Sequence, residues 1–265
     1  VSRLFRHSGI YVRAGAGIEK PEDLRGKRIG LPEYQITAVV WMRGMLQHEY
    51  GVKPSEIQWR SGGQEQAGRE ERTPLKSIPG LDLKAIPKDK TLVGMLRDGE
   101  LDALFTARGP SSFLRGEPHI KRLFPDIRAT EMAYYKKTKL FPIMHLVGIK
   151  KTLVAQYPWL ATSLYKAFLE AKALAMIDLL DVNALMVTLP WLSAETHATQ
   201  QVMGNDFWRY GVDESRHEIE APGSQLGMVD RGQRIEHRAI EPPPECDGDV
   251  GCGLFADLLH DHAGL

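Results

Sequence analysis

In the N-terminal part of the chain, short extended segments that mix apolar and polar residues flank one long helical pattern. A strand is expected at residues 27–31; it is followed by a turn at 32–35 and then by a helical pattern that begins at Thr37. Apolar side chains recur along one face of that pattern, and Gly51 is a typical helix end. A second extended run follows at 56–59. This order predicts a β-α-β unit of an α/β fold, with Thr37 placed to cap the helix.

The rest of the chain predicts further strands and helices separated by turns. Strands are expected at residues 10–12, 83–86, 101–105 and 142–149, and helices at 91–98, 159–180 and 193–203.

Two segments lack such a pattern. Residues 62–79 are polar and marked by Gly and Pro, which predicts an exposed loop. From about Ala221 onward the chain becomes acidic and rich in Pro and Gly. We expect little packed structure in that tail.

Composition argues against several classes of protein. Lys plus Arg and Asp plus Glu both number 34, so bulk charge favours neither nucleic acid nor a membrane surface as a partner. The chain has no run of about 18 apolar residues, so we expect no membrane-spanning segment. Cys246 and Cys252 fit no common zinc or redox spacing, and His260 and His262 form a weak metal candidate. We therefore expect no bound metal.

Two motifs resemble a known fold family. They are Pro-Glu-Asp-Leu-Arg-Gly-Lys-Arg-Ile-Gly (21–30), which precedes the predicted helix, and Gly-Glu-Leu-Asp-Ala-Leu (99–104). Both look like parts of the second lobe of type II periplasmic binding proteins. The resemblance implies a two-lobed α/β fold and leaves the chemistry open.

Four further segments carry a narrower resemblance. They are Phe-Arg-His-Ser-Gly-Ile-Tyr-Val (5–12), Gly-Leu-Pro-Glu-Tyr-Gln-Ile-Thr-Ala-Val-Val-Trp (30–41), Leu-Phe-Pro-Ile-Met-His-Leu-Val-Gly (140–148) and Asn-Asp-Phe-Trp-Arg-Tyr-Gly (205–211). Together they are similar to the 4,5-dihydroxyphthalate decarboxylases. The resemblance covers about residues 2–220.

The resemblance implies a division of the chain. Residues 1–14 would be a remnant of lobe 1 and the hinge, residues 15–141 lobe 2, and residues 142–220 the return hinge and the lobe 1 helices. Residues 221–265 would form an irregular tail, where the chain departs from the family. We expect the first lobe to be truncated at its N-terminus relative to the family.

The same resemblance implies a function. It is the non-oxidative decarboxylation of 4,5-dihydroxyphthalate to 3,4-dihydroxybenzoate in phthalate degradation, by a cytoplasmic enzyme without a cofactor. The expected partner is a small aromatic dicarboxylate, and a homo-oligomer is compatible with it. Two alternatives stay open: a solute-binding protein of an ABC transporter for a small anion, and an inactive gene remnant.

Decarboxylation needs a base that ionises the ring hydroxyl para to the leaving carboxylate, and an acid that protonates the ring carbon. His7 and His145 are candidates because histidine titrates in the useful range, and Glu33 is a further candidate base. Simpler interpretations remain open: an exposed idle side chain for His7, a hydrogen-bonded core residue for His145 and a turn residue for Glu33.

An aromatic dianion also needs cations and hydrogen-bond donors. Arg6 precedes the first strand and Arg108 follows the strand at 101–105, where either would suit a carboxylate. Thr37 begins a helix whose first N–H groups favour an anion, and Tyr34 could stack on the ring or hydrogen-bond it. The simpler interpretations are solvated arginines, a helix cap and a turn residue.

Overall fold

The computed structural model describes residues 2–71 and 78–225. The strands are β1 (Ser2–Arg3), β2 (Ile10–Arg13), β3 (Arg28–Leu31), β4 (Gln58–Ser61), β5 (Asp82–Ala85), β6 (Ala103–Phe105), β7 (Ile120–Arg122) and β8 (Ile143–His145). The helices are α1 (Thr37–Tyr50), α2 (Leu92–Arg97), α3 (Ser111–Leu114), α4 (Ile127–Thr138), α5 (Lys151–Gln156), α6 (Leu160–Asp178), α7 (Leu192–Met203) and α8 (Arg216–Gln225). Short 3₁₀ turns are η1 (His7–Gly9), η2 (Pro21–Leu24) and η3 (Pro54–Glu56).

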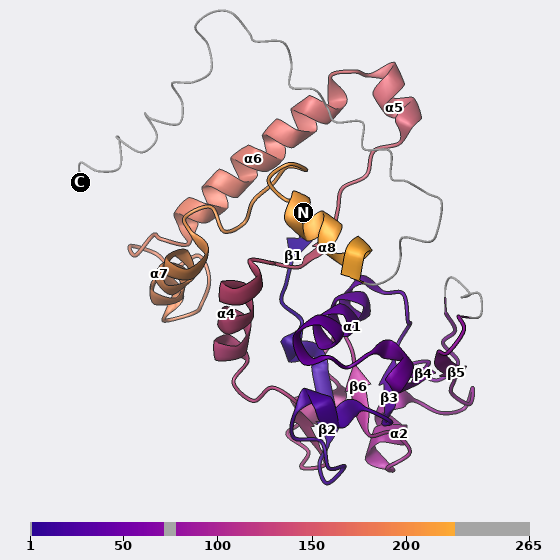
Figure 1. Ribbon diagram of the computed structural model, residues 1–265. Coiled ribbons are helices and arrows are strands. Elements are labelled where there is room, and N and C mark those ends of the chain that lie inside the picture. Colours follow the sequence, from indigo (N-terminus) through magenta and orange to yellow (C-terminus); the bar gives the residue numbers. More distant parts are fainter. Residues whose placement is uncertain (1, 72–77, 226–265) are drawn as a thin grey trace, which may run out of the picture. The chain divides into compact units, whose positions relative to one another are not determined.

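A mixed sheet of six strands organises the described part of the chain, in the order β5-β4-β3-β6-β2-β7 (Figure 1). Strands β3, β4, β5 and β6 are parallel, whereas β2 runs antiparallel to both β6 and β7. The predicted β-α-β unit is confirmed as β3, α1 and β4. The carboxyl ends of the parallel strands and the start of β2 therefore share one edge of the sheet.

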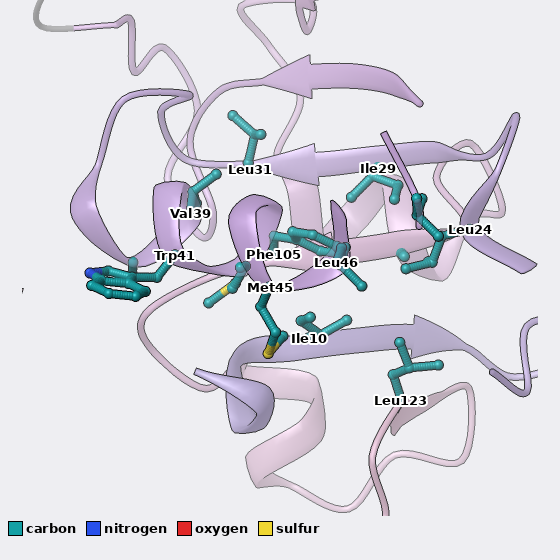
Figure 2. Close-up of a cluster of buried hydrophobic side chains, with 14 of the residues drawn as sticks. Ile10, Leu24, Ile29, Leu31, Val39, Trp41, Met45, Leu46, Phe105 and Leu123 are labelled. Atoms are coloured by element: carbon teal, nitrogen blue, oxygen red, sulfur yellow. The ribbon is translucent and has the colours of Figure 1, made fainter. Parts of the chain in front are cut away.

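The two faces of the sheet carry separate hydrophobic clusters. Because side chains alternate along a strand, Ile10 and Phe105 join the cluster under α1, whereas Tyr11 and Leu104 join the cluster that includes α2. Figure 2 shows the first of these clusters, with Met45 of α1 among the buried side chains. The sheet thus has a covering helix on each face, which is the layering of an α/β fold.

The ends of α1 differ in how well the sequence predicts them. Gly51 follows the helix in the left-handed region with φ 66°, as expected. Thr37 was expected to cap the start, and this is wrong. The cap position is Ile36, which is extended and whose carbonyl accepts the N–H of Val40. Thr37 is therefore the first helical residue, one position too late for its side chain to cap.

Other elements depart from the prediction. Strand β4 begins at Gln58, because Pro54 starts a 3₁₀ turn where an extended run was expected. Helix α4 was not predicted, since Tyr134 and Tyr135 are its buried residues and they give no helical period. Packed structure was expected to stop near Ala221, yet α8 continues to Gln225 and Ala221 is buried.

The other predicted elements lie close to where they were expected. The strand predicted at 83–86 is β5, the helix at 91–98 contains α2, and the longest predicted helix contains α6. The cysteine pair and the His260 and His262 candidate lie outside the described residues. The division into lobes stays a prediction.

A two-stranded ribbon brings the start of the chain to its later part. Strand β1 pairs with β8 antiparallel. The buried guanidinium of Arg3 donates to the carbonyl of Phe141 at 2.8 Å, to Ser215 Oγ at 2.8 Å and to Glu218 Oε1 at 3.1 Å. These bonds attach α8 to the ribbon.

The two helices that directly follow the ribbon, α5 and α6, have no buried residue. Helix α6 has no buried side chain, and Tyr165, Phe168 and Leu174 are exposed apolar residues along it. Over residues 2–71 and 78–225, every helix is too short or too polar to cross a membrane.

Candidate active site

Four chain segments meet at the carboxyl edge of the parallel strands. They are the turns after β3, β4 and β6 and the segment that precedes β2 (Figure 1). The segments are joined by hydrogen bonds: the N–H of Thr106 donates to the carbonyl of Gly9 at 3.0 Å, and Gln64 Nε2 donates to the carbonyl of Arg108 at 3.2 Å. This is the edge where open α/β sheets bind ligands.

Glu33 lies in the turn after β3, almost fully buried at 5% exposure. Its carboxylate forms an ion pair with Arg69. The next residue, Tyr34, donates its backbone N–H to Glu71 Oε1 at 2.7 Å. The loop after β4 is therefore attached to this turn by two contacts. Arg69 of the loop pairs with Glu33 of the turn, and Glu71 of the loop accepts the N–H of Tyr34.

Tyr34 packs inward rather than toward solvent. Its ring lies edge-on to Trp59 with centroids 5.8 Å apart, and the Arg43 guanidinium lies 3.6 Å above the ring. Burial raises the pKa of the Tyr34 phenol, and Arg43 partly opposes that shift. The phenol is therefore a neutral hydrogen-bond donor at neutral pH.

Thr37 and Arg108 are both exposed at the same edge. Thr37 occupies the first turn of α1, where backbone N–H groups lack intrahelical partners. Within the described ranges, the guanidinium of Arg108 has neither a hydrogen bond nor an ion pair. An anion approaching this edge would meet free donors on both residues.

Arg6 is half-buried beside the ribbon. Its Nε donates to Met144 Sδ at 2.8 Å, and its terminal amino groups make no hydrogen bond to any described residue. Burial lowers the pKa of Arg6, whereas the nearby carboxyl of Glu131 raises it. Arginine stays charged under these conditions, so Arg6 is an incompletely paired cation beside the ribbon.

His7 is buried, with 1% of its surface exposed. Its ring packs edge-on against Phe124 at 5.2 Å and Tyr134 at 5.1 Å between centroids. Burial lowers its pKa to about 4, so the imidazole is neutral at pH 7. The interpretation of His7 as an exposed idle side chain is wrong.

His145 ends β8 and is exposed, so its interpretation as a core histidine is also wrong. Its Nδ1 lies 2.6 Å from the Ser2 hydroxyl, a hydrogen bond that orients the ring. The neighbouring residue Met144 contacts Arg6. Arg6 thus contacts the strand that His145 ends, one residue before His145.

Sequence reasoning missed Glu131. It lies on α4, and its Oε1 is 3.8 Å from Nδ1 of His7. Burial raises its pKa to about 7. No local signal could have found it, because α4 itself has no clear apolar period.

The described residues contain no group of three or more His, Cys, Asp or Glu side chains that could hold a metal ion. Their arrangement offers instead neutral and charged groups for proton transfer, and arginines for anions.

A comparison with protein-family models indicates the class of protein to which the chain is similar. Residues 3–67 match the family model described as NMT1/THI5 like. That family has the type II periplasmic-binding-protein-like fold, and the mixed sheet with helices agrees with it. The predicted fold class is therefore confirmed.

The comparison with individual proteins is more specific. Over 241 residues the chain is 48% identical to a 4,5-dihydroxyphthalate decarboxylase of Comamonas testosteroni, covering 91% of this chain and 72% of that protein. It is also 44% identical over 135 residues to a 4,5-dihydroxyphthalate decarboxylase of Pseudomonas putida, covering 51% of this chain and 52% of that protein. The chain belongs to the 4,5-dihydroxyphthalate decarboxylase family, as the sequence resemblance indicated.

Proposed function

We propose that this chain is a carboxy-lyase that converts 4,5-dihydroxyphthalate to 3,4-dihydroxybenzoate without oxidation. The observation that carries this proposal is the 48% identity, over 91% of the chain, to a relative named for that activity. The incompletely paired Arg6, beside the ribbon, and Arg108, at the sheet edge, each suit a carboxylate and support it.

The reaction is a sequence of proton transfers and one bond cleavage. A base takes the proton of the hydroxyl para to the leaving carboxylate, and the ring carbon that bears the carboxylate accepts a proton. The bond from that carbon to the carboxylate then breaks, carbon dioxide leaves, and its electron pair restores the aromatic ring. The phenolate oxygen regains a proton from solvent. No electrons leave the substrate, so we expect no redox cofactor.

We propose His7 as the base and His145 as the acid. His7 is neutral at pH 7 because burial lowers its pKa, so one ring nitrogen is unprotonated before substrate binds. His145 is exposed and oriented by Ser2, so it is able to exchange protons with solvent. Glu33 is the alternative base, in the turn after β3 at the carboxyl edge of the parallel strands.

We propose Arg6 and Arg108 as the partners of the two carboxylates. Thr37 would add its hydroxyl and the N–H groups of the first turn of α1. Tyr34 packs inward, so a hydrogen bond from its neutral phenol to the ring hydroxyls would require its side chain to turn toward this edge.

The test is direct turnover. The purified chain is incubated with 4,5-dihydroxyphthalate, and formation of 3,4-dihydroxybenzoate is followed by liquid chromatography together with carbon dioxide release. Binding measured by calorimetry without any product would contradict the enzyme proposal and favour a solute-binding protein.

We also propose a cytoplasmic homo-oligomer. The exposed apolar side chains of α6 support association, because large apolar patches on a protein surface commonly mark interfaces. Light scattering after size-exclusion chromatography measures the assembly, and cell fractionation measures the location. A strictly monomeric chain would contradict the first part, and product-forming activity confined to another compartment the second.

A further inference from the structure

His7 and Glu131 face one another from two elements far apart in the sequence. His7 begins η1, and Glu131 lies on α4, which packs against η1. His7 Nδ1 and Glu131 Oε1 are 3.8 Å apart, and the side chains are 1% and 18% exposed. Neither ring nitrogen of His7, nor Glu131 Oε1, has a hydrogen-bond partner among the described residues. A buried polar group without a partner disfavours folding by about 1–3 kcal/mol, so this arrangement calls for a functional explanation.

Burial shifts the pKa values of the two side chains in opposite directions. Burial raises the pKa of Glu131 to about 7, while the N–H of Ser8 and the charges of Arg122 and Arg6 favour its ionised form. Burial alone lowers the pKa of His7. Tyr134 of α4, which packs on the His7 ring, has its pKa raised to about 12 and stays neutral. At neutral pH a neutral imidazole therefore faces a carboxyl group whose pKa burial raises to about 7.

Glu131 also lines a cavity beside α4. The cavity has a volume of about 310 Å³. Its walls are mostly apolar and aromatic, and they include Phe5, Tyr135, Phe141 and Trp208. A second carboxyl group, that of Glu195, lines the same cavity and is paired with Arg128. Glu131 thus lines an aromatic cavity and also faces a buried histidine, whereas Glu195 lines the same cavity and pairs with Arg128.

We propose that Glu131 is a positioning residue for His7 in the decarboxylation proposed above, on which this inference rests. Its carboxylate accepts a hydrogen bond from Nδ1–H of His7, which fixes the tautomer that leaves Nε2 free as the base. When the substrate hydroxyl gives its proton to Nε2, the O–H bond breaks, an N–H bond forms, and the carboxylate offsets the new charge of the imidazolium. The present separation has to shorten to about 3 Å, a tightening that catalytic pairs commonly show when substrate binds.

Glu131→Gln tests this role, because glutamine keeps the size of the side chain and removes its charge. We expect kcat to fall on the order of 10²-fold with KM changed less than about twofold, since the loss is in proton transfer rather than in binding. In the wild type, kcat/KM should fall as the pH drops below about 7, where Glu131 gains its proton. That limb should be absent in Glu131→Gln and retained in Glu131→Asp.

The matched control is Glu195→Gln, which changes the other carboxyl group of the cavity and should keep both kcat and the pH limb. Circular dichroism verifies that each variant is folded. A Glu131→Gln variant with wild-type kcat and an unchanged pH limb would overturn the proposal.

A second readout separates this proposal from the proposed function. The imidazole of His7 is titrated by nuclear magnetic resonance without substrate, in the wild type and in Glu131→Gln. Coupling appears as a chemical-shift inflection near pH 7 that the variant lacks, and its absence would overturn the pairing even in an active enzyme. Coupling in a protein that makes no 3,4-dihydroxybenzoate would support the pair and overturn its assignment to this reaction.

Discussion

Partial burial of Arg6 strengthens the carboxylate-binding role proposed for it. A half-buried guanidinium with free terminal amino groups gains more from a carboxylate than a solvated one does, because less water competes for it. An arginine in an exposed ion pair, such as Arg97 with Asp98, is solvated and already paired, so it gains less from a further carboxylate.

We therefore expect Arg6→Ala to raise KM by about 10- to 100-fold, corresponding to the roughly 1.5–3 kcal/mol of a charge-assisted hydrogen bond. Steady-state kinetics measure this change. The control Arg97→Ala should keep the wild-type KM. Equal KM values for the two variants would remove Arg6 from the substrate site.

His7 makes stability depend on pH. Its pKa in the folded state, about 4, lies below the ordinary value of 6.5, so the unfolded chain binds a proton in this range and the folded chain does not. The contribution of His7 is fully present above pH 6.5 and is lost as the pH falls from 6.5 to 4.

His7→Phe should remove that dependence, since phenylalanine fits among Phe124 and Tyr134 and has no nitrogen to satisfy. We expect a variant without turnover whose Tm is at least that of the wild type at pH 7. Its advantage in Tm should grow at pH 4.5. Differential scanning calorimetry at the two pH values measures this, and a constant difference in Tm would contradict it.

At the scale of elements, the contact between η1 and the end of β6 positions the candidate base. Gly9 approaches Thr106 so closely that an added Cβ would lie 2.5 Å from its carbonyl oxygen and would also collide with the Met42 side chain. The backbone at this point cannot yield easily, because Thr106 N–H donates to the Gly9 carbonyl.

Gly9→Ala should therefore destabilise the protein by about 1–3 kcal/mol, the usual range for overpacking a core. Urea unfolding measures the free energy of unfolding. Gly148→Ala is the control, because nothing lies within 4 Å of a Cβ there. A Gly9→Ala variant as stable as the control would mean that η1 has another position.

The elements themselves could be predicted to different degrees. Helix α1 was predicted because its apolar spacing and Gly51 are local signals. Helix α4 was missed because its contribution comes from Tyr134, Tyr135 and Glu131, whose burial depends on distant segments. The candidate site shows the same division: its edge residues follow short motifs of the sequence and stay predictions, whereas Glu131 was not foreseen.

At the scale of the whole described chain, one buried ion pair connects its two ends. The side chains of Arg3 and Glu218 are 1% and 0% exposed and lie 3.1 Å apart. Arg209 adds a second contact to the same carboxylate oxygen at 3.3 Å. Removing one partner would leave a buried charge without compensation.

Glu218→Ala should thus lower the free energy of unfolding by about 3–5 kcal/mol. The exposed Glu220, which pairs with Arg216 on the same helix, is the control, and Glu220→Ala should cost at most about 0.5 kcal/mol. Denaturant unfolding of both variants measures the difference. Similar values for the two would show that α8 does not depend on Arg3.

The sequence by itself determined the α/β class, the β-α-β unit around α1 and the family to which the chain belongs. These follow from local period, turn chemistry and short motifs, which are properties of neighbouring residues. Only the tertiary structure decided that His7 is buried and neutral, that His145 is exposed, and that Glu131 faces His7. Desolvation and charge pairing depend on which distant segments pack together, and the pattern along the chain does not contain that information.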